Sequence, residues 1–161
     1  GLLQGSQLSV LGREDKHLMI YARIDLSKTN YQPMQNRWRY IHDPDAAKLD
    51  ALYLAYCKHK KFPSFMPIFT SEYTDHRNDV IGYYDQQDHL IAFSLIRRYD
   101  MHDAECIQFA WDYAEPRLRL GIESLKHECA IYKDRGFRYL YLGEADEYKT
   151  EIQGFETMGP A

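Results

Sequence analysis

The strongest constraint on the fold is a strand, a helix and a second strand in immediate succession in the C-terminal half. Residues 105–113 have the composition of a strand, and residues 122–134 carry apolar side chains at helical spacing. Gly136 then stops the helix because glycine accepts the left-handed conformation, and residues 137–142 predict another strand. Such a crossover joins parallel strands, so the two strands are expected to lie side by side.

An antiparallel meander is predicted just before this crossover. Residues 79–84, 89–99 and 105–113 are strand-like segments, separated by the turns D-Q-Q-D and M-H-D-A. An amphipathic helix precedes them, with Asp43 as its expected N-cap and Pro44 in its first turn. The predicted fold class is therefore α/β (α+β), a mixed sheet in which an antiparallel meander is followed by a parallel strand-helix-strand crossover.

A single domain is expected over residues 1–161, because this length buries one sizeable core and is too short for two. Residues 1–16 predict a loose arm, residues 17–24 a strand, and residues 148–156 a final helix. The N-terminus shows neither an initiator Met nor a secretory signal, so we expect a trimmed chain or an excised domain with a cytoplasmic location.

Composition and spacing exclude several classes of protein. No apolar run approaches the roughly 18 residues needed to cross a bilayer, so no membrane association is expected. The histidines lack metal-ligand spacing and the three cysteines lack a C-x-x-C pair, which predicts no metal site and reduced, buried thiols. With a net charge of −4, the chain could hold nucleic acid only through local basic patches, at residues 58–61 or at Arg117 and Arg119.

Four short motifs follow one another between residues 79 and 156. They are E-P at residues 115–116, R-L-G-I at 119–122, Y-L-Y-L-G at 139–143 and Y-K-T-E-I-Q-G-F-E at 148–156. Together with the element order, they resemble the GNAT superfamily, and within it the aminoacyl-tRNA–protein transferases of the arginyl and leucyl kinds. Those transferases carry an acidic-Pro step, S-L-G-T, Y-L-Y-L-G and Y-K-x-x-F-x-P-x-E in this order. This chain departs from them at Ile152 and Gly154, where the family has Phe and Pro.

The resemblance implies an N-acyltransferase that transfers an aminoacyl or acyl group to an amino group. The acceptor would be an amine on a protein N-terminus or on a small molecule. The donor would be an aminoacyl-tRNA, whose acceptor end would then be a partner, or an acyl-CoA, and no covalently bound cofactor is expected.

The loop before the second predicted helix is the candidate donor site. A helix that begins near Gly121 points its first N–H groups and its positive dipole end at an anion, such as the pyrophosphate of coenzyme A or the phosphates of tRNA. Arg117 and Arg119 could add charge-assisted bonds, and Leu120, Gly121 and Ile122 form the first turn. The alternative is an ordinary helix start with two solvated arginines.

Three side chains are candidates for catalysis, as the resemblance implies. Asp112 at the end of the central strand and Glu144 just after the last strand could deprotonate the attacking amine. Tyr148 could give a proton to the leaving group. The alternative is that both carboxylates are exposed at strand ends and that Tyr148 is a half-buried helix residue.

Two other functions stay open at this point. The first is a conventional acyl-CoA N-acetyltransferase with a degenerate loop, because Gly121 does not complete the Q/R-x-x-G-x-G/A pattern of ordinary coenzyme A loops. The second is a catalytically silent GNAT-like module that only binds.

Overall fold

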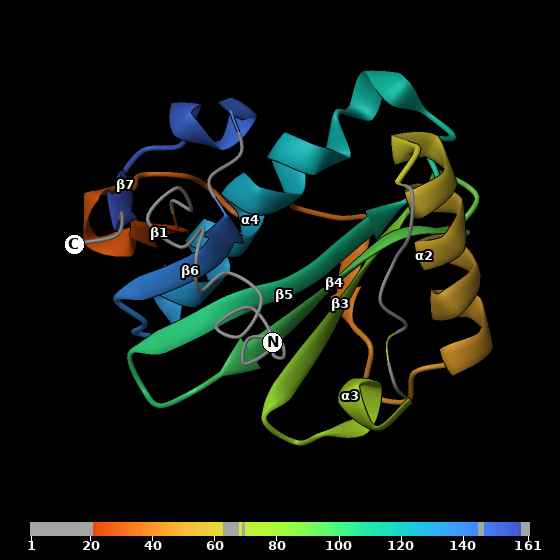
Figure 1. Ribbon diagram of the computed structural model, residues 1–161, viewed down its shortest axis with the longest axis horizontal. Coiled ribbons are helices and arrows are strands. Elements are labelled where there is room, and N and C mark those ends of the chain that lie inside the picture. Colours follow the sequence, from red (N-terminus) through yellow and green to blue (C-terminus); the bar gives the residue numbers. More distant parts are fainter. Residues whose placement is uncertain (1–20, 63–67, 69, 145–146, 159–161) are drawn as a thin grey trace, which may run out of the picture.

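The computed structural model describes residues 21–62, 68, 70–144 and 147–158. The described part contains one sheet of seven strands in the order β2-β3-β4-β5-β6-β1-β7 (Figure 1). These strands are β1 (Tyr21–Asp25), β2 (Trp38–Tyr40), β3 (Asn78–Tyr84), β4 (Leu90–Arg98), β5 (Asp103–Trp111), β6 (Tyr139–Glu144) and β7 (Phe155–Met158). The helices are α2 (Ala46–Lys60), α3 (Thr70–Thr74) and α4 (Leu120–Asp134), with short 3-10 turns η2 (Leu26–Lys28), η3 (Pro116–Leu118) and η4 (Glu147–Glu151).

The predicted meander and crossover are both confirmed. Strands β3, β4 and β5 pair antiparallel in succession, and β5 pairs parallel with β6 across the helix α4. The mixed α/β fold class is therefore as predicted. These pairings were predictable because the connections are short and each strand pairs with the next strand along the chain.

Helices cover both faces of the meander. Along β3, Val80 packs in a cluster with Leu49 and Tyr53 of α2, whereas the next residue, Ile81, packs in a cluster with Leu125 and Cys129 of α4. Because successive side chains of a strand point to opposite faces, α2 and α4 lie on opposite sides of the sheet. In Figure 1, α2 lies beside the meander and α4 passes behind β6.

The start of α2 differs from the prediction. The N-cap is Asp45 rather than Asp43, because the Asp45 carboxylate accepts hydrogen bonds from the backbone N–H groups of Ala47 (3.1 Å) and Lys48 (3.4 Å). A cap two residues later places Pro44 outside the helix. Leu49, in the first turn of α2, is buried.

The predicted final helix over residues 148–156 is wrong. The chain makes the 3-10 turn η4 and then the strand β7, which pairs antiparallel with β1. Gly154 lies between them with φ of +74°, a conformation that breaks a helix and that proline cannot adopt. The strand predicted over residues 17–24 is described from Tyr21 onward as β1, between β6 and β7. The predicted loose arm, residues 1–16, lies outside the described residues.

Candidate functional site

The parallel strands β5 and β6 diverge soon after they pair. Among the described residues their ladder joins Asp103 to Tyr139, Ala104 to Leu140 and Glu105 to Tyr141. Beyond this point β5 continues to Trp111 beside β4, while β6 stays paired with β1. The register between β4 and β5 also shifts here, which leaves Ile107 as an extra β5 residue. Such a bulge bends a strand, and here it accompanies the opening between the two strands.

A cleft of about 260 Å³ lies at this opening. Its walls come from β5, from α4 and from the residues around them: Tyr56, Phe62, Ser94, Cys106, Ile107, Gln108, Phe109, Gly121, Ser124, Leu125, Glu128, Leu142 and Lys149. We call it the β5–β6 cleft. Because Ile107 packs with the α2 cluster and Leu125 with the α4 cluster, the cleft reaches side chains from both faces of the sheet.

The most unusual side chain of the β5–β6 cleft is Glu128 of α4, which is only 3% exposed. Its Oε2 accepts a hydrogen bond from the Tyr83 hydroxyl (2.5 Å) and one from the Ser94 hydroxyl (2.5 Å). Burial raises the pKa of Glu128 to about 7, although these hydrogen bonds and the positive charge of Lys149 act in the opposite direction. Both protonation states are therefore populated near neutral pH.

Cys106 also lines the cleft and as a residue is only partly buried, contrary to the expectation that all three cysteines are buried. Burial of the sulfur and the negative charge of Glu128 raise the pKa of Cys106 well above its usual value. The thiol is protonated at neutral pH, and a thiolate nucleophile is not supported. Cys57 and Cys129 are buried as predicted.

Of the predicted donor-site residues, Gly121 lines the β5–β6 cleft. Leu120 is buried and faces another hollow beside Tyr83, while Ile122 packs against the core. Arg117 and Arg119 are exposed, and Arg119 caps α4 in the left-handed conformation with φ of 49°. The five residues are close in the sequence, but of these five only Gly121 lines the β5–β6 cleft.

Of the predicted catalytic residues, the structure describes the side chain of Asp112 alone, and this residue does not line the β5–β6 cleft. Asp112 is exposed, accepts a hydrogen bond from the Ala114 N–H (2.9 Å) and lines a separate hollow beside α2. The side chains of Glu144 and Tyr148 lie outside what the structure describes, although the Glu144 backbone pairs with Tyr21 in the sheet. The roles proposed for these three residues stay predictions.

Glu128 was missed by the sequence interpretation, although a signal was present. Residues four positions apart share one face of a helix, so Glu128 lies on the face of Ser124 and Tyr132. Both of these neighbours are buried. A carboxylate within a buried helix face was the pattern that could have identified it.

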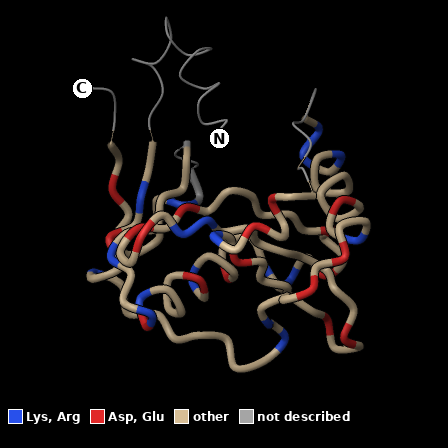
Figure 2. The backbone as a smooth tube through the Cα atoms, turned by 90° about the horizontal axis from the view of Figure 1, so that it is seen from below, with Lys and Arg blue, Asp and Glu red and all other residues tan. Residues whose placement is uncertain are grey.

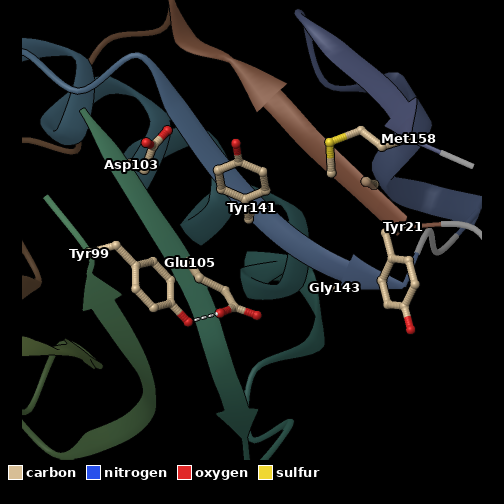
Figure 3. A pocket seen from close by; sticks show the side chains of 8 residues that line it. Tyr21, Tyr99, Asp103, Glu105, Tyr141, Gly143 and Met158 are labelled. Carbon is tan, nitrogen blue, oxygen red and sulfur yellow. Dashed lines mark hydrogen bonds between the residues drawn. The ribbon is translucent and has the colours of Figure 1, made fainter. Parts of the chain in front are cut away.

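A second hollow, of about 400 Å³, lies on the other side of the same strand pair (Figure 3). Figure 3 shows Tyr99, Tyr141 and Tyr21 around it, with the Tyr99 hydroxyl donating to Glu105 (2.5 Å). Asp103 and Glu105 point to this side, whereas Ala104 and Cys106 lie in or against the α4 core. The last paired residues, Glu105 and Tyr141, line this hollow, whereas the next residue of β5, Cys106, lines the β5–β6 cleft.

Neither a cluster of metal ligands nor a membrane-spanning helix occurs in the described part of the chain. There, no group of three or more His, Cys, Asp or Glu side chains could hold a metal ion. Likewise, none of the helices in the described ranges is both long and apolar enough to cross a membrane.

Solved structures with the same architecture identify the fold. The C-terminal domain (DUF2156) of a putative lysylphosphatidylglycerol synthetase from Agrobacterium fabrum matches 80% of this chain and 47% of its own, with 12% identity and a TM-score of 0.59. A putative acetyltransferase from the GNAT family of Novosphingobium aromaticivorans matches 87% of this chain and 60% of its own, with 18% identity and a TM-score of 0.58. Saccharomyces cerevisiae N-myristoyltransferase with bound myristoyl-CoA and inhibitors matches 88% and 48%, with 8% identity and a TM-score of 0.55.

These likenesses show that the chain has a GNAT-like fold, as the element order and motifs predicted. The chain spans about half the length of the solved structures it matches. No protein-family model matches the sequence, and no curated protein matches it significantly. The narrower resemblance to arginyl and leucyl transferases stays a prediction.

Proposed function

We propose that the protein is a GNAT-type N-acyltransferase that joins an acyl or aminoacyl group to an amine in the β5–β6 cleft. The opening of the β5–β6 ladder after Glu105 and Tyr141 is the observation that carries this proposal. Backbone N–H groups that leave a ladder can instead stabilise the oxyanion that forms when an amine attacks an ester or thioester carbonyl. The cleft would hold the two reacting groups in line, which lowers the entropic part of the barrier.

The preferred donor is an aminoacyl-tRNA. The Y-L-Y-L-G and Y-K motifs support it, and the fold shared with a putative lysylphosphatidylglycerol synthetase supports the transfer of an aminoacyl group. Two backbone N–H groups of the loop before α4 already form hydrogen bonds within the loop. The N–H of Leu118 donates to the carbonyl of Glu115, and the N–H of Arg119 donates to the carbonyl of Pro116. A donor phosphate would therefore meet the exposed side chains of Arg117 and Arg119 rather than these two amides.

Charge distribution limits how a tRNA could be held. Figure 2 shows basic and acidic residues interspersed along the described chain. The exposed pair Arg117 and Arg119, close to the cleft residue Gly121, is therefore the local patch proposed to meet the phosphates of the acceptor end. Acyl-CoA is the alternative donor, supported by the fold shared with an N-myristoyltransferase that has myristoyl-CoA bound.

The acceptor is proposed to be a primary amine on a chain end or a small molecule. A cleft of about 260 Å³ is below the usual size of drug-binding pockets, so it suits an extended chain end better than a folded surface. A protein N-terminus and a small amine both satisfy this requirement.

A donor panel tests the proposal. The protein is incubated with leucyl-, arginyl- and lysyl-tRNA, acetyl-CoA and myristoyl-CoA, together with a mixture of peptides and small amines, and mass spectrometry detects the new amide. Gly121→Leu is the blocking variant, because a Cβ at Gly121 meets no atom within 4 Å and the longer side chain can extend into the cleft. Glu123→Leu is the matched control, since Glu123 lines a different hollow.

We expect transfer from an aminoacyl-tRNA, its loss in Gly121→Leu and its retention in Glu123→Leu. Transfer from acyl-CoA alone would replace the preferred donor with the alternative one. If no donor reacts and none protects the protein against thermal unfolding, the transferase proposal fails. Donor protection without transfer would instead support a silent binding module.

A further inference from the structure

We propose that Glu128 is the proton acceptor of this reaction, taking a proton from the attacking ammonium group in the β5–β6 cleft. The inference rests on the proposed function and adds a catalytic residue to it. Glu128 lines the cleft, whereas Asp112 lines a separate hollow beside α2. The side chains of Glu144 and Tyr148, the other residues that the sequence suggested, lie outside what the structure describes.

Three elements fix the Glu128 carboxylate. The residue itself belongs to α4, Tyr83 comes from β3 and Ser94 from β4, and both hydroxyls donate to the same oxygen, Oε2. Gly121 and Ser124 lie two turns and one turn earlier on the same helix and line the same cleft. A carboxylate held in this way can receive a proton without prior rearrangement of the side chain.

The groups around Glu128 leave it free to change its protonation state. Tyr83 of β3, Cys106 of β5 and Cys129 of α4 all have raised pKa values, so they are protonated and neutral near pH 7. Lys149 of η4 supplies a positive charge that favours the carboxylate. No arginine forms an ion pair with Glu128 in the described chain, so its charge is not fixed in the way that a paired carboxylate is.

The reaction balances with Glu128 as the proton acceptor. The ammonium group gives one proton to the Glu128 carboxylate and becomes a neutral amine, whose nitrogen attacks the donor carbonyl carbon. A C–N bond forms and the C–O bond of an ester, or the C–S bond of a thioester, breaks. The leaving oxygen or sulfur takes the second nitrogen proton, and Glu128 later releases its proton to solvent.

Glu128→Gln tests the role, because glutamine keeps the size of the side chain and can accept the same hydrogen bonds. The rate of transfer by the wild-type protein should rise with pH up to about pH 7 and then level off. In Glu128→Gln, kcat/KM should fall by about 100-fold or more and lose this pH dependence, as removal of a positioned base generally does. Glu123→Gln is the control and should match the wild type, because Glu123 is a half-buried carboxylate on the same helix that pairs with Lys126 and lines a different hollow.

The pH profile of Ser94→Ala is a second test, because a purely structural role of Glu128 would leave this profile unchanged. Loss of one hydrogen bond to the carboxylate should shift the rising limb of the pH profile upward by about one pH unit. Carbon-detected NMR of the Glu128 carboxyl, assigned by its loss in Glu128→Gln, should show a midpoint near 7 in the wild-type protein that moves in the same direction.

The outcomes separate the two proposals. Transfer by the wild-type protein, with Glu128→Gln within threefold of it and an unchanged pH profile, would overturn the role of Glu128 and leave the transferase intact. Absence of transfer by the wild-type protein with every donor would overturn the function and this role together. An NMR midpoint near 4.5 in the wild-type protein would also overturn the role, because the Glu128 carboxyl would then not titrate in the pH range over which the rate rises.

Discussion

Asp25 and Glu128 are two carboxylates buried to the same extent, 3% exposed each, in opposite electrostatic settings. Asp25, at the end of β1, accepts hydrogen bonds from the Arg138 guanidinium (2.7 and 3.1 Å) and from the Ser27 hydroxyl (2.6 Å). These bonds lower the pKa of Asp25 below its usual range. Glu128 has two neutral hydroxyls instead, and burial raises its pKa to about 7.

The difference shows that burial by itself does not mark a functional carboxylate. A guanidinium partner fixes the negative charge and ties β1 to the residue just before β6, which is a structural role. Neutral partners leave the charge adjustable, and enzymes place carboxylates in such surroundings when a proton must be moved. Substitutions at or beside Asp25 and Glu128 therefore differ in their expected effects.

The largest effect is expected from Gly154→Ala beside Asp25. An added Cβ would lie 2.4 Å from the Asp25 carbonyl oxygen, and the φ of +74° disfavours any residue with a side chain. Overpacking and left-handed strain together should reduce the free energy of unfolding by about 4 kcal/mol. Urea denaturation measures the loss.

Gly121→Ala is the control for this substitution, because its Cβ meets open space. Removing a glycine from the helix should raise the free energy of unfolding by up to about 1 kcal/mol. Equal behaviour of the two variants would show that the contact between Gly154 and Asp25 is not as described.

Glu128→Gln is expected to stabilise the fold, increasingly so as pH rises. A pKa raised from 4.5 to about 7 means that the folded protein favours the protonated acid, so the wild type loses stability as pH increases through this window. The variant should match the wild type at pH 4 and exceed it by up to about 3 kcal/mol at pH 8. Urea denaturation over this pH range tests the prediction.

His127, whose pKa burial lowers to about 4, titrates in both of these proteins and cancels in the difference. A pH-independent difference between Glu128→Gln and the wild type would mean that the Glu128 carboxyl titrates alike in the folded and unfolded states. The contrast with Asp25 would then disappear.

Asp25→Asn should destabilise the fold, with the opposite pH dependence and a smaller magnitude. Because the pKa of Asp25 is lowered, its stabilising contribution is present above about pH 4 and is lost as pH falls further. Removing the charge should cost about 2 kcal/mol at pH 7, less than for a fully buried pair because the Arg138 side chain is 51% exposed. As pH falls below 4 the gap between the two proteins in urea denaturation should narrow progressively, closing only below the lowered pKa of Asp25, and a constant gap would contradict the prediction.

The fold was largely predictable because its central elements are local. Strands β3 to β6 and helix α4 follow one another with turn residues at their ends, and the Gly136 stop has the expected positive φ of 94°. The pairing of β7 with β1 joins segments more than 130 residues apart, from Phe155 back to Ile24, and no local pattern encodes such a contact. The helix predicted over residues 148–156 failed for this reason.

The candidate site was less predictable than the fold. Gly121 was identified because a helix start needs no distant partner to be recognised. The protonation behaviour of Glu128 depends on Tyr83 and Ser94, which approach it only when β3 and β4 pack against α4. Sequence motifs direct attention to strand ends, whereas this carboxylate becomes unusual through tertiary packing.

The smallest effect is expected from Asp112→Asn, which tests that distinction directly. Asp112 is exposed, and its Oδ1 accepts a hydrogen bond from Ala114 that an asparagine side chain can also accept. The free energy of unfolding should change by less than about 0.5 kcal/mol, as at most surface sites. Transfer should stay within about twofold of the wild type, because Asp112 lines a hollow beside α2 and not the β5–β6 cleft. A loss comparable to that of Glu128→Gln, measured in the same transfer assay, would instead place the proton acceptor at the end of β5, where the sequence motifs first suggested it.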